Sequence, residues 1–387
     1  MSAPIFLLSW KVPPDTSGSA IIVGNLAKQF SAHEMVVAGE RPYRRPAVAW
    51  KDEWPAITYV TTGWPDTKRG ARWWRRFQLP VLILRSCWIV KRHRCGKMIV
   101  VFPSEEFLVA GYATSLLTGI PMFVYLHNTY VEQCRPDGVH HRVASWLQSR
   151  IFARARHTFV MSKGMVELYR ERYPHLRCSP LVHSFNEDMP EFLPPPPPGV
   201  PPHFVLCGNV NDSCADATVR VCAAISQIQG TLSIISGTPK CHLERLGILN
   251  DRVRYKTVSR DLVLNHLREG DIVLLPHGFT GGLSAEEYLT IFPTKTIELL
   301  ISGRPILAHA PASSYLARFL RKHQCALVVE VPQVEAILAA IERLRNDADL
   351  RSRLVRNALQ AAESFRASRV ASTLRFCLDE HDTQLVS

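Results

Sequence analysis

The chain has 387 residues, more than one hydrophobic core usually organises, so we expect two domains. With 47% hydrophobic and 21% charged residues it is an ordinary globular sequence, and its apolar runs are shorter than the ~18 residues that span a membrane, so we expect no transmembrane helix. Ten cysteines without a C-x-x-C pair argue against a metal site and favour a reducing, cytoplasmic setting.

The first predicted elements are a strand, a loop and a helix, which is how a doubly wound α/β domain begins. Residues 5–10 form an apolar strand rather than a secretory signal, because no basic segment precedes them. A turn-rich loop containing Gly18 follows, and apolar residues at helical spacing continue to Phe30. Gly18 could bring backbone N–H groups close to a phosphate or a sugar, or could simply make a tight turn.

The net charge of +12 is concentrated in the N-terminal half. Residues 1–189 hold 25 Lys and Arg against 14 Asp and Glu, and residues 67–97 contain ten of these cations and no acid. Aromatic residues alternate with the cations, a pattern typical of a segment on an anionic membrane surface. One alternative is a core helix over 79–90 with Trp73 and Trp74 packed beneath a loop. The other is a nucleic-acid surface, but no nucleic-acid-binding motif accompanies the segment, so we expect no nucleic acid partner.

Strands and helices then keep alternating. We expect a strand at 97–102, a helix at 104–117 capped by Ser104, and a strand at 121–127. His127 is therefore predicted to lie at the carboxyl end of a strand, where open α/β sheets bind ligands. A lone histidine often has a purely structural role, which is the alternative here.

One more helix and strand lead to a change in composition. Residues 139–155 form a basic amphipathic helix, residues 157–161 a strand, and Ser162 caps the helix after it. Residues 190–202 then contain eight prolines. A polyproline tract is extended and semi-rigid, so we interpret it as a linker between two domains.

A second series of strands and helices follows the linker. A strand at 203–207 ends at Gly208, and a strand at 232–235 ends at Ser236 and Gly237.

The most informative stretch is FPTKTIELLISGRPILAH, residues 292–309, which follows a predicted glycine-containing loop at 278–290. It predicts a helix that Gly303 ends, followed by a short buried strand. Lys295 and Glu298 share one helical face beside the helix start, which favours an anionic ligand.

Helices are expected over most of residues 334–365. Asp347 and Asp349 match the D-x-D pattern of metal-dependent transferases, but they fall between two helices. We therefore interpret Asp347 as a helix cap and expect no metal site.

Residues 292–309 resemble the P-x-K-x-x-E-x-x-x-x-G-x-P-[IV]-[LI]-A segment of retaining glycosyltransferases of family 4, which have the GT-B fold, and weaker similarities lie at 157–186 and 203–208. The resemblance implies an α/β protein of two facing doubly wound, Rossmann-like domains with a C-terminal crossover helix. The expected ranges are 1–189 for the acceptor-side domain, 190–202 for the linker, 203–365 for the nucleotide-sugar domain and 366–387 for the crossover helix.

The same resemblance implies the site residues. Glu298 would hold the ribose hydroxyls of a nucleoside diphosphate sugar, and Ser259 lies in a segment similar to the family's base-binding turn. The candidate catalytic residues are His127, Lys295 and Glu298. The candidate donor-binding residues are Gly18, Gly208, Ser236, Gly237, Ser259, Thr290, Thr294, Lys295 and Glu298.

Two departures from the family pattern concern the donor. Thr290 stands where the family usually places another Glu, and no Arg or Lys follows Gly208, where many members have a pair that grips the diphosphate. Lys295, Lys240 or a basic residue of the other domain would have to meet that charge.

The resemblance implies transfer of a sugar from a nucleoside diphosphate sugar to a hydroxyl of a glycan or lipid-linked acceptor, with retention of configuration and without metal or cofactor. The protein would be cytoplasmic, in contact with the inner face of the membrane. The alternatives are a non-catalytic nucleotide-sugar-binding protein and a sugar-nucleotide epimerase of the same fold.

Overall fold

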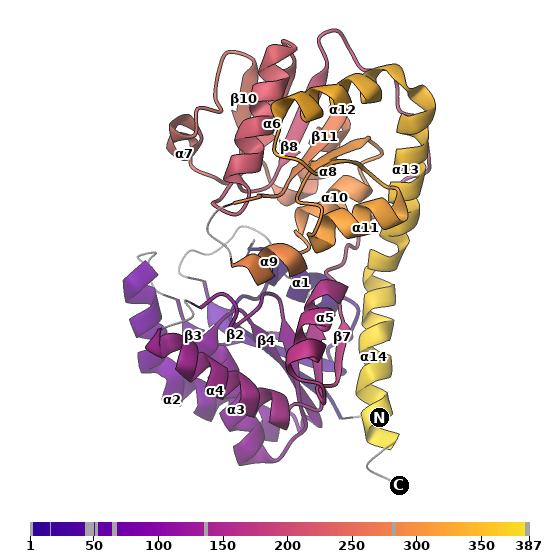
Figure 1. The fold of residues 1–387 in the computed structure, drawn as a ribbon. Coiled ribbons are helices and arrows are strands. Elements are labelled where there is room, and N and C mark those ends of the chain that lie inside the picture. The colour runs from indigo at the N-terminus through magenta and orange to yellow at the C-terminus, as the bar shows by residue number, and fades with distance from the viewer. Residues whose placement is uncertain are drawn as a thin grey trace. The chain divides into compact units, whose positions relative to one another are not determined.

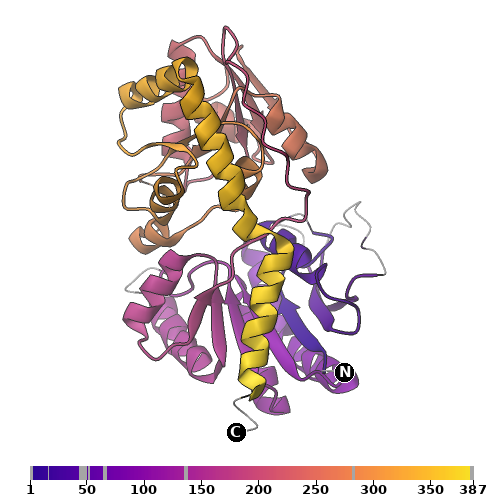
Figure 2. The ribbon, with the colours of Figure 1, turned by 90° about the vertical axis from the view of Figure 1, so that its right-hand side faces the viewer.

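The computed structural model describes residues 3–15, 17–42, 50, 53–63, 68–134, 138–280 and 284–383, and its contacts group the chain into two compact units. Unit 1 comprises Met1–Asn186 and Arg366–Ser387, and unit 2 comprises Glu187–Phe365 (Figures 1 and 2). Residue 67, the side chain of Arg72, and Gly281 and Gly282 of the predicted glycine loop lie outside the described residues.

Within the described residues, unit 1 contains a seven-stranded parallel sheet in the order β3-β2-β1-β4-β5-β6-β7. Its central strands are continuous apolar runs, such as IFLLS in β1 and KMIVVF in β4, because helices cover both faces of the sheet. The strands are β1 (Ile5–Ser9), β2 (Met35–Arg41), β3 (Ile57–Thr62), β4 (Lys97–Phe102), β5 (Met122–Leu126), β6 (His157–Val160) and β7 (Cys178–Pro180).

The helices of unit 1 divide between the two faces. The connections β1-α1-β2 and β4-α3-β5 run in opposite directions along the sheet, so right-handed crossovers put α1 and α3 on opposite faces. Helix α2 packs on α3, and α14, drawn in yellow in Figure 2, packs on α1. The helices are α1 (Gly18–Ala27), α2 (Lys68–Arg92), α3 (Glu105–Thr118), α4 (Val139–Arg154), α5 (Lys163–Arg172) and α14 (Ala367–Thr383).

The predicted basic segment forms one long helix. Helix α2 contains Pro80 in its interior rather than starting near it, and packing on α3 and β3 offsets the backbone hydrogen bond that this proline removes. Trp73 is 72% exposed, so the interpretation that placed it beneath a loop is wrong. Trp74 instead donates from Nε1 to the carbonyl of Thr62 (2.9 Å). No helix in the described ranges is long and apolar enough to cross a membrane.

Unit 2 contains, in its described part, a six-stranded parallel sheet in the order β10-β9-β8-β11-β12-β13. Fully buried side chains of β8 and β11 form the centre of its core. The strands are β8 (His203–Cys207), β9 (Thr231–Ile235), β10 (Val253–Lys256), β11 (Ile272–Pro276), β12 (Ile306–His309) and β13 (Leu327–Val329).

The helices of unit 2 correct one prediction. Residues 278–290 were expected to form a loop, but the second half of this range is a helix, because Ser284 caps it by accepting from the N–H of Glu287 (3.2 Å). The helices are α6 (Ala215–Gln227), α7 (Lys240–Arg245), α8 (Arg260–Arg268), α9 (Ala285–Thr290), α10 (Lys295–Leu300), α11 (Tyr315–His323), α12 (Val334–Asn346), α13 (Ala348–Ala362) and the 3₁₀ turn η1 (Glu363–Phe365).

Three predicted helix caps have different outcomes. Ser162 accepts a hydrogen bond from the N–H of Met165 (3.0 Å), and Asp347 accepts one from the N–H of Leu350 (2.7 Å), as expected. Ser104 precedes α3 but makes no side-chain cap, because its hydroxyl donates to Glu106 instead (2.8 Å). That part of the prediction is wrong.

Candidate functional site

The order of the strands in unit 2 reverses between β8 and β11, which lie side by side while their following helices run towards opposite edges of the sheet. The carboxyl ends of two such strands leave a crevice in which doubly wound proteins bind their ligands. Gly208 directly follows β8 and adopts φ +92°, a conformation that residues with a side chain rarely adopt. A Cβ at this position would lie 3.2 Å from Cδ of Lys295, so the backbone turn and the lysine pack against each other.

Lys295 and Glu298 stand on the first turn of α10 at this edge. Nζ of Lys295 is buried and has no hydrogen-bond partner among the described residues. Oε1 of Glu298 forms an ion pair with Nη2 of Arg260 (2.8 Å). The buried Oε2 of Glu298 makes no hydrogen bond within the described part of the chain. Burial raises the pKa of Glu298, and the Arg260 guanidinium opposes that rise.

Cys207, the last residue of β8, shows how closely these charges gather. Its pKa is raised to about 12, mainly by burial and then by the Glu298 carboxylate, while Lys295 and Arg260 act in the opposite direction. One thiol at the end of the strand therefore lies within the field of all three charged groups. Because two of these groups are cations and one is a carboxylate, the edge carries a net positive charge that suits an anionic ligand.

Hydrogen bonds join the turn after β9 to the turn after β8. One of the joining residues, Asn209, was not predicted from the sequence. Asn209 accepts a hydrogen bond from the N–H of Gly237 through Oδ1 (3.2 Å). The N–H of Val210 donates to Oγ1 of Thr238 (2.9 Å), and the N–H of Thr238 donates to Ser236 (2.9 Å). The structure thus brings the predicted Gly208 and Ser236-Gly237 turns together. They meet because β8 and β9 are neighbours in the sheet, which the local sequence does not show.

Three further predicted donor residues of unit 2 have the following local positions. Ser259 is the residue before α8 and so adjoins Arg260. Thr294 precedes α10 in a helical conformation and makes no side-chain cap there. The hydroxyl of Thr290 donates to the carbonyl of Glu286 within α9 (2.8 Å). The hydroxyl thus supports its own helix.

Two basic residues of unit 2 are engaged elsewhere. Arg220 donates to Nε2 of His309 (3.0 Å) and to Asp216 (2.8 Å), and the N–H of Phe279 also donates to Asp216 (3.0 Å). Lys240, which the sequence offered as a partner for phosphate, is exposed and lies 3.8 Å from Glu244. Arg260 was not predicted to bind the charged part of the nucleotide sugar. It lies beside Glu298, whereas Arg220 and Lys240 pair with other acids.

In unit 1 the structure brings together two of the predicted loops. His127 follows β5, and its Nδ1 lies 3.1 Å from the hydroxyl of Ser19, the residue after Gly18 at the start of α1. Burial and then the nearby His183 lower the pKa of His127 to about 3, so its ring is neutral near pH 7. Its Nε2 is buried and makes no hydrogen bond with any described residue.

Metal ligands do not gather in the described residues, where no group of three His, Cys, Asp or Glu side chains could hold an ion.

Comparisons with known proteins give similarity of fold alone. No protein-family profile and no curated sequence matches the chain. Among solved structures, sucrose-phosphate synthase from Thermosynechococcus elongatus aligns with TM-score 0.73 and 16% identity over 100% of both chains. HepE from Anabaena in complex with UDP-glucose aligns with TM-score 0.67 and 15% identity, covering 97% of this chain and 99% of HepE.

A putative UDP-N-acetylglucosamine 2-epimerase from Listeria monocytogenes is a more distant match, with TM-score 0.57 and 10% identity over 99% of this chain and 98% of its own. The two parallel Rossmann-like sheets, the C-terminal helices and these full-length alignments confirm the predicted fold class. The chain has the GT-B fold.

Proposed function

We propose that the protein is a glycosyltransferase that moves a sugar from a nucleoside diphosphate sugar to a hydroxyl acceptor. The observation that carries the proposal is the convergence of Gly208, Lys295, Glu298 and Arg260 at the switch point of unit 2. The fold is shared with a protein solved with UDP-glucose bound, which supports a nucleotide sugar as the ligand. We take UDP-glucose as the first donor to test.

Each charged residue has a defined task in this proposal. Glu298 accepts hydrogen bonds from the ribose hydroxyls, for which its buried Oε2 has free capacity among the described residues. Lys295 faces the diphosphate, whose negative charge grows as the sugar leaves. The buried Nζ of Lys295 needs no reorganisation to receive that charge. Metal is then unnecessary, and retention of configuration is proposed on the family resemblance alone.

His127 is assigned a role in orienting the reacting sugar or acceptor. Because its pKa is about 3, it cannot supply a proton as an imidazolium near pH 7. The neutral ring is held through Nδ1 by Ser19, which leaves Nε2 to form a hydrogen bond with a hydroxyl.

The test measures donor binding and turnover separately. UDP-glucose affinity is measured calorimetrically for the wild type, Glu298→Ala and Lys295→Met, with Lys240→Met as a matched control on an exposed lysine of the same unit. Losing a hydrogen bond to a charged group costs about 1.5–3 kcal/mol, so each site variant should bind roughly tenfold to a hundredfold more weakly. Unaltered affinity in both site variants would refute the donor site.

Product analysis then separates the three activities. A transferase forms a glycoside only when an acceptor is present, an epimerase changes the sugar nucleotide without one, and a non-catalytic protein binds UDP-glucose but consumes none. Formation of an isomeric sugar nucleotide in the absence of acceptor would replace the transferase proposal.

We also propose that unit 1 docks on an anionic membrane surface through α2. Its exposed apolar side chains recur at spacings of four, four, three and four residues, which places them on one helical face: Trp73, Phe77, Val81, Leu84 and Trp88. Exposed cations lie on the same helix at Arg76, Arg85, Lys91 and Arg92. An apolar stripe accompanied by cations and no acid complements an anionic lipid surface.

Neighbouring helices extend this surface. Helix α3 packs beside α2 and exposes Leu116 and Leu117. Helix α4 is joined to α3 near both of its ends, by His140 to Glu105 and by Arg154 to Ser115, and it exposes a short apolar stripe: Val139, Val143 and Trp146. These side chains favour a membrane over a narrow peptide groove.

Vesicle sedimentation tests this surface with phosphatidylglycerol and phosphatidylcholine vesicles. The triple variant Phe77→Ser, Leu84→Ser, Trp88→Ser should bind the anionic vesicles about tenfold or more weakly, since each lost side chain removes apolar burial. Phe376→Ser is the control, because Phe376 is 63% exposed on α14 of the same unit. Equal binding by the triple variant and the control would eliminate the proposal, and so would binding that ignores salt.

A further inference from the structure

A pocket lies at the switch point of unit 1. The sheet order reverses between β1 and β4, and Trp10 directly follows β1 while Ser104 lies just beyond β4. Together with Tyr130, which follows β5, they line a pocket with a volume of about 600 Å³. This volume falls within the usual range of small-molecule sites, roughly 300–1,000 Å³.

The charges of the lining balance. Arg75 and Arg76 lie beside Glu105 and Glu106 in the lining, with nitrogen-to-oxygen distances of 3.8–4.0 Å. These distances are at the limit of ion pairing, so hydroxyl groups of a ligand can enter the pairs as donors to carboxylate and acceptors from guanidinium. A phosphate or an ammonium ion would gain little from a lining with two charges of each sign.

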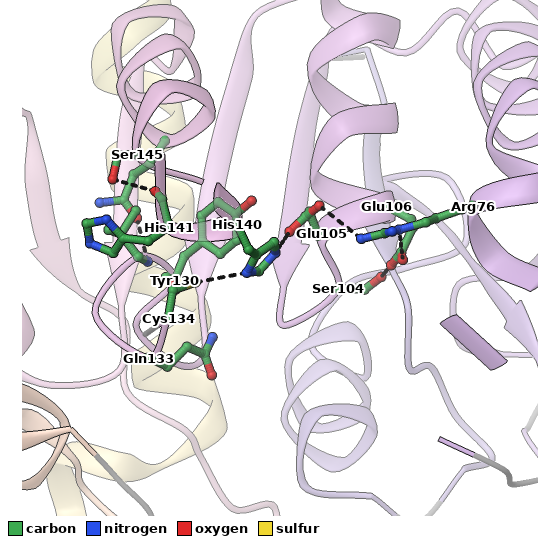
Figure 3. Close-up of polar contacts among 12 residues, drawn as sticks. Arg76, Ser104, Glu105, Glu106, Tyr130, Gln133, Cys134, His140, His141 and Ser145 are labelled. Atoms are coloured by element: carbon green, nitrogen blue, oxygen red, sulfur yellow. Dashed lines mark hydrogen bonds and ion pairs between the residues drawn. The ribbon is translucent and has the colours of Figure 1, made fainter. Parts of the chain in front are cut away.

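A chain of polar contacts joins several residues of the pocket lining (Figure 3). Sγ of Cys134 lies 3.4 Å from Nδ1 of His140, and Nε2 of His140 lies 2.7 Å from Glu105. Glu105 continues to Arg76, and Arg76 to Glu106. Each member fixes the next, so the polar groups are held in place before a ligand arrives.

Two buried polar atoms in the lining have unused hydrogen-bonding capacity. Tyr130 is 3% exposed, and its hydroxyl lies close to the Glu105 carboxylate, which raises the pKa of Tyr130 in addition to burial. The phenol oxygen keeps its capacity to accept a hydrogen bond. Nε of Arg75 likewise has no hydrogen-bond partner in the described part of the chain. Buried polar groups are usually satisfied, so these atoms indicate a ligand with hydroxyl groups.

We propose that this unit-1 pocket binds a neutral sugar ring of the acceptor, through the Tyr130 hydroxyl, the Glu105 carboxylate and the two arginines. The role as acceptor site rests on the proposed transferase function, whereas sugar binding itself does not. A neutral ring offers many hydroxyls and no charge, which matches the balanced lining better than an anion does.

Ligand-observed saturation-transfer NMR tests the pocket with the methyl glycosides of glucose, galactose, mannose and N-acetylglucosamine. Excess UDP is present, so that a nucleotide site in unit 2 does not add to the signal. At least one glycoside should bind the wild type, and inorganic phosphate should not displace it. Tyr130→Phe and Glu105→Gln should each weaken that binding about tenfold.

Matched controls separate the pocket from the fold. Tyr112→Phe on α3 and Glu171→Gln on α5 change the same groups outside the pocket and should bind like the wild type. Tyr130→Phe removes one hydroxyl that lies beside Glu105 and keeps the ring, so its thermal unfolding midpoint should stay close to that of Tyr112→Phe.

The outcomes also separate the two proposals. Glycoside binding that Tyr130→Phe weakens supports the pocket even if UDP-glucose fails to bind. Binding of UDP-glucose without any glycoside signal overturns the sugar pocket and leaves the donor site standing. Displacement of the glycoside by inorganic phosphate, or equal binding by all variants, also overturns the pocket.

Discussion

The two sheets end in switch points of different construction. In unit 2, the edge is made of backbone turns, a glycine with positive φ and one lysine packed on it. In unit 1, the edge is made of long side chains, with arginine, glutamate and aromatic groups around an open pocket. A lysine held in place against a tight backbone turn suits a diphosphate, which is the same in every donor of this kind. The varied side chains of the unit-1 pocket suit a ligand, such as an acceptor, that differs from one protein to another.

The same contrast extends to stability. Unit 1 packs α3 so closely on its sheet that a Cβ at Gly111 would lie 2.3 Å from Cγ2 of Val100. The Gly111 contact of unit 1 lies between helix and strand, away from the pocket lining, whereas the Gly208 contact of unit 2 lies in the candidate site, against Lys295. Substitutions at the two glycines should therefore affect different properties.

The largest effect is expected for Gly111→Ala, which inserts a methyl group where no space exists. Overpacking of this kind costs about 1–3 kcal/mol, and it should lower the thermal unfolding midpoint without weakening UDP-glucose binding by unit 2. Combining it with Val100→Ala should restore part of the loss, because Val100 is the side chain that the new Cβ meets. A double variant less stable than Gly111→Ala would show that the close approach is not the cause.

Next comes Gly208→Ala, which combines backbone strain with displacement of Lys295. Gly247→Ala is the matched control, because Gly247 has φ +67° but no atom within 4 Å of the added Cβ. Both should lose about 1–2 kcal/mol of stability from the left-handed backbone. Only Gly208→Ala should also weaken UDP-glucose binding, by about tenfold. Equal affinities in a calorimetric titration would mean that the lysine does not serve the donor.

A smaller effect is expected from the helix caps of unit 1. Ser162→Ala removes a hydroxyl that accepts from the N–H of Met165 and should cost about 1 kcal/mol in chemical denaturation. Ser104→Ala removes no cap, so its loss should be smaller and should depend on Glu106, to which the hydroxyl donates. Equal losses in the two variants would contradict this assignment of the caps.

Much of the fold could be predicted from the sequence because local signals and the sheet agree. Continuous apolar runs predicted strands such as β4 and β8, and Gly303 ends the helix before β12 with φ +72°, as expected. Two local predictions, the start of a helix near Pro80 and the cap at Ser104, failed because each residue can adopt a second arrangement that the tertiary structure favours. Pro80 often marks a helix start, yet tertiary packing carries α2 through it, and Ser104 had a carboxylate nearby that competed with the backbone.

The sites were less predictable because their members are distant in sequence. The spacing of Lys295 and Glu298 placed them on one helical face, but nothing local indicated Arg260 as the partner of Glu298. The unit-1 pocket draws on α2, α3 and the loop before α4, and only their packing brings Arg76, Glu105 and His140 together. The assigned roles of the donor residues stay predictions until binding is measured.

The smallest effect, and the one that most sharpens the contrast between the sites, is the pH dependence of donor binding. Burial raises the pKa of Glu298, and Arg260 lowers it. The ionised carboxylate is the better acceptor for ribose hydroxyls, so UDP-glucose affinity should be full above this pKa and fall as the pH drops through it. His277 and His309, each with a pKa of about 4, stay neutral near pH 6–7 and add no transition there.

In Arg260→Gln the charge that favours the ionised carboxylate is gone, so the midpoint of the affinity loss should move to higher pH. The loss of affinity should grow as the pH falls, because protonation of Glu298 then competes directly with ribose binding. Calorimetry with UDP-glucose, whose own charge is constant over this range, measures it. An unchanged midpoint would mean that Arg260 acts on the donor itself, and the unit-2 edge would then hold the diphosphate with two side-chain cations rather than with one lysine.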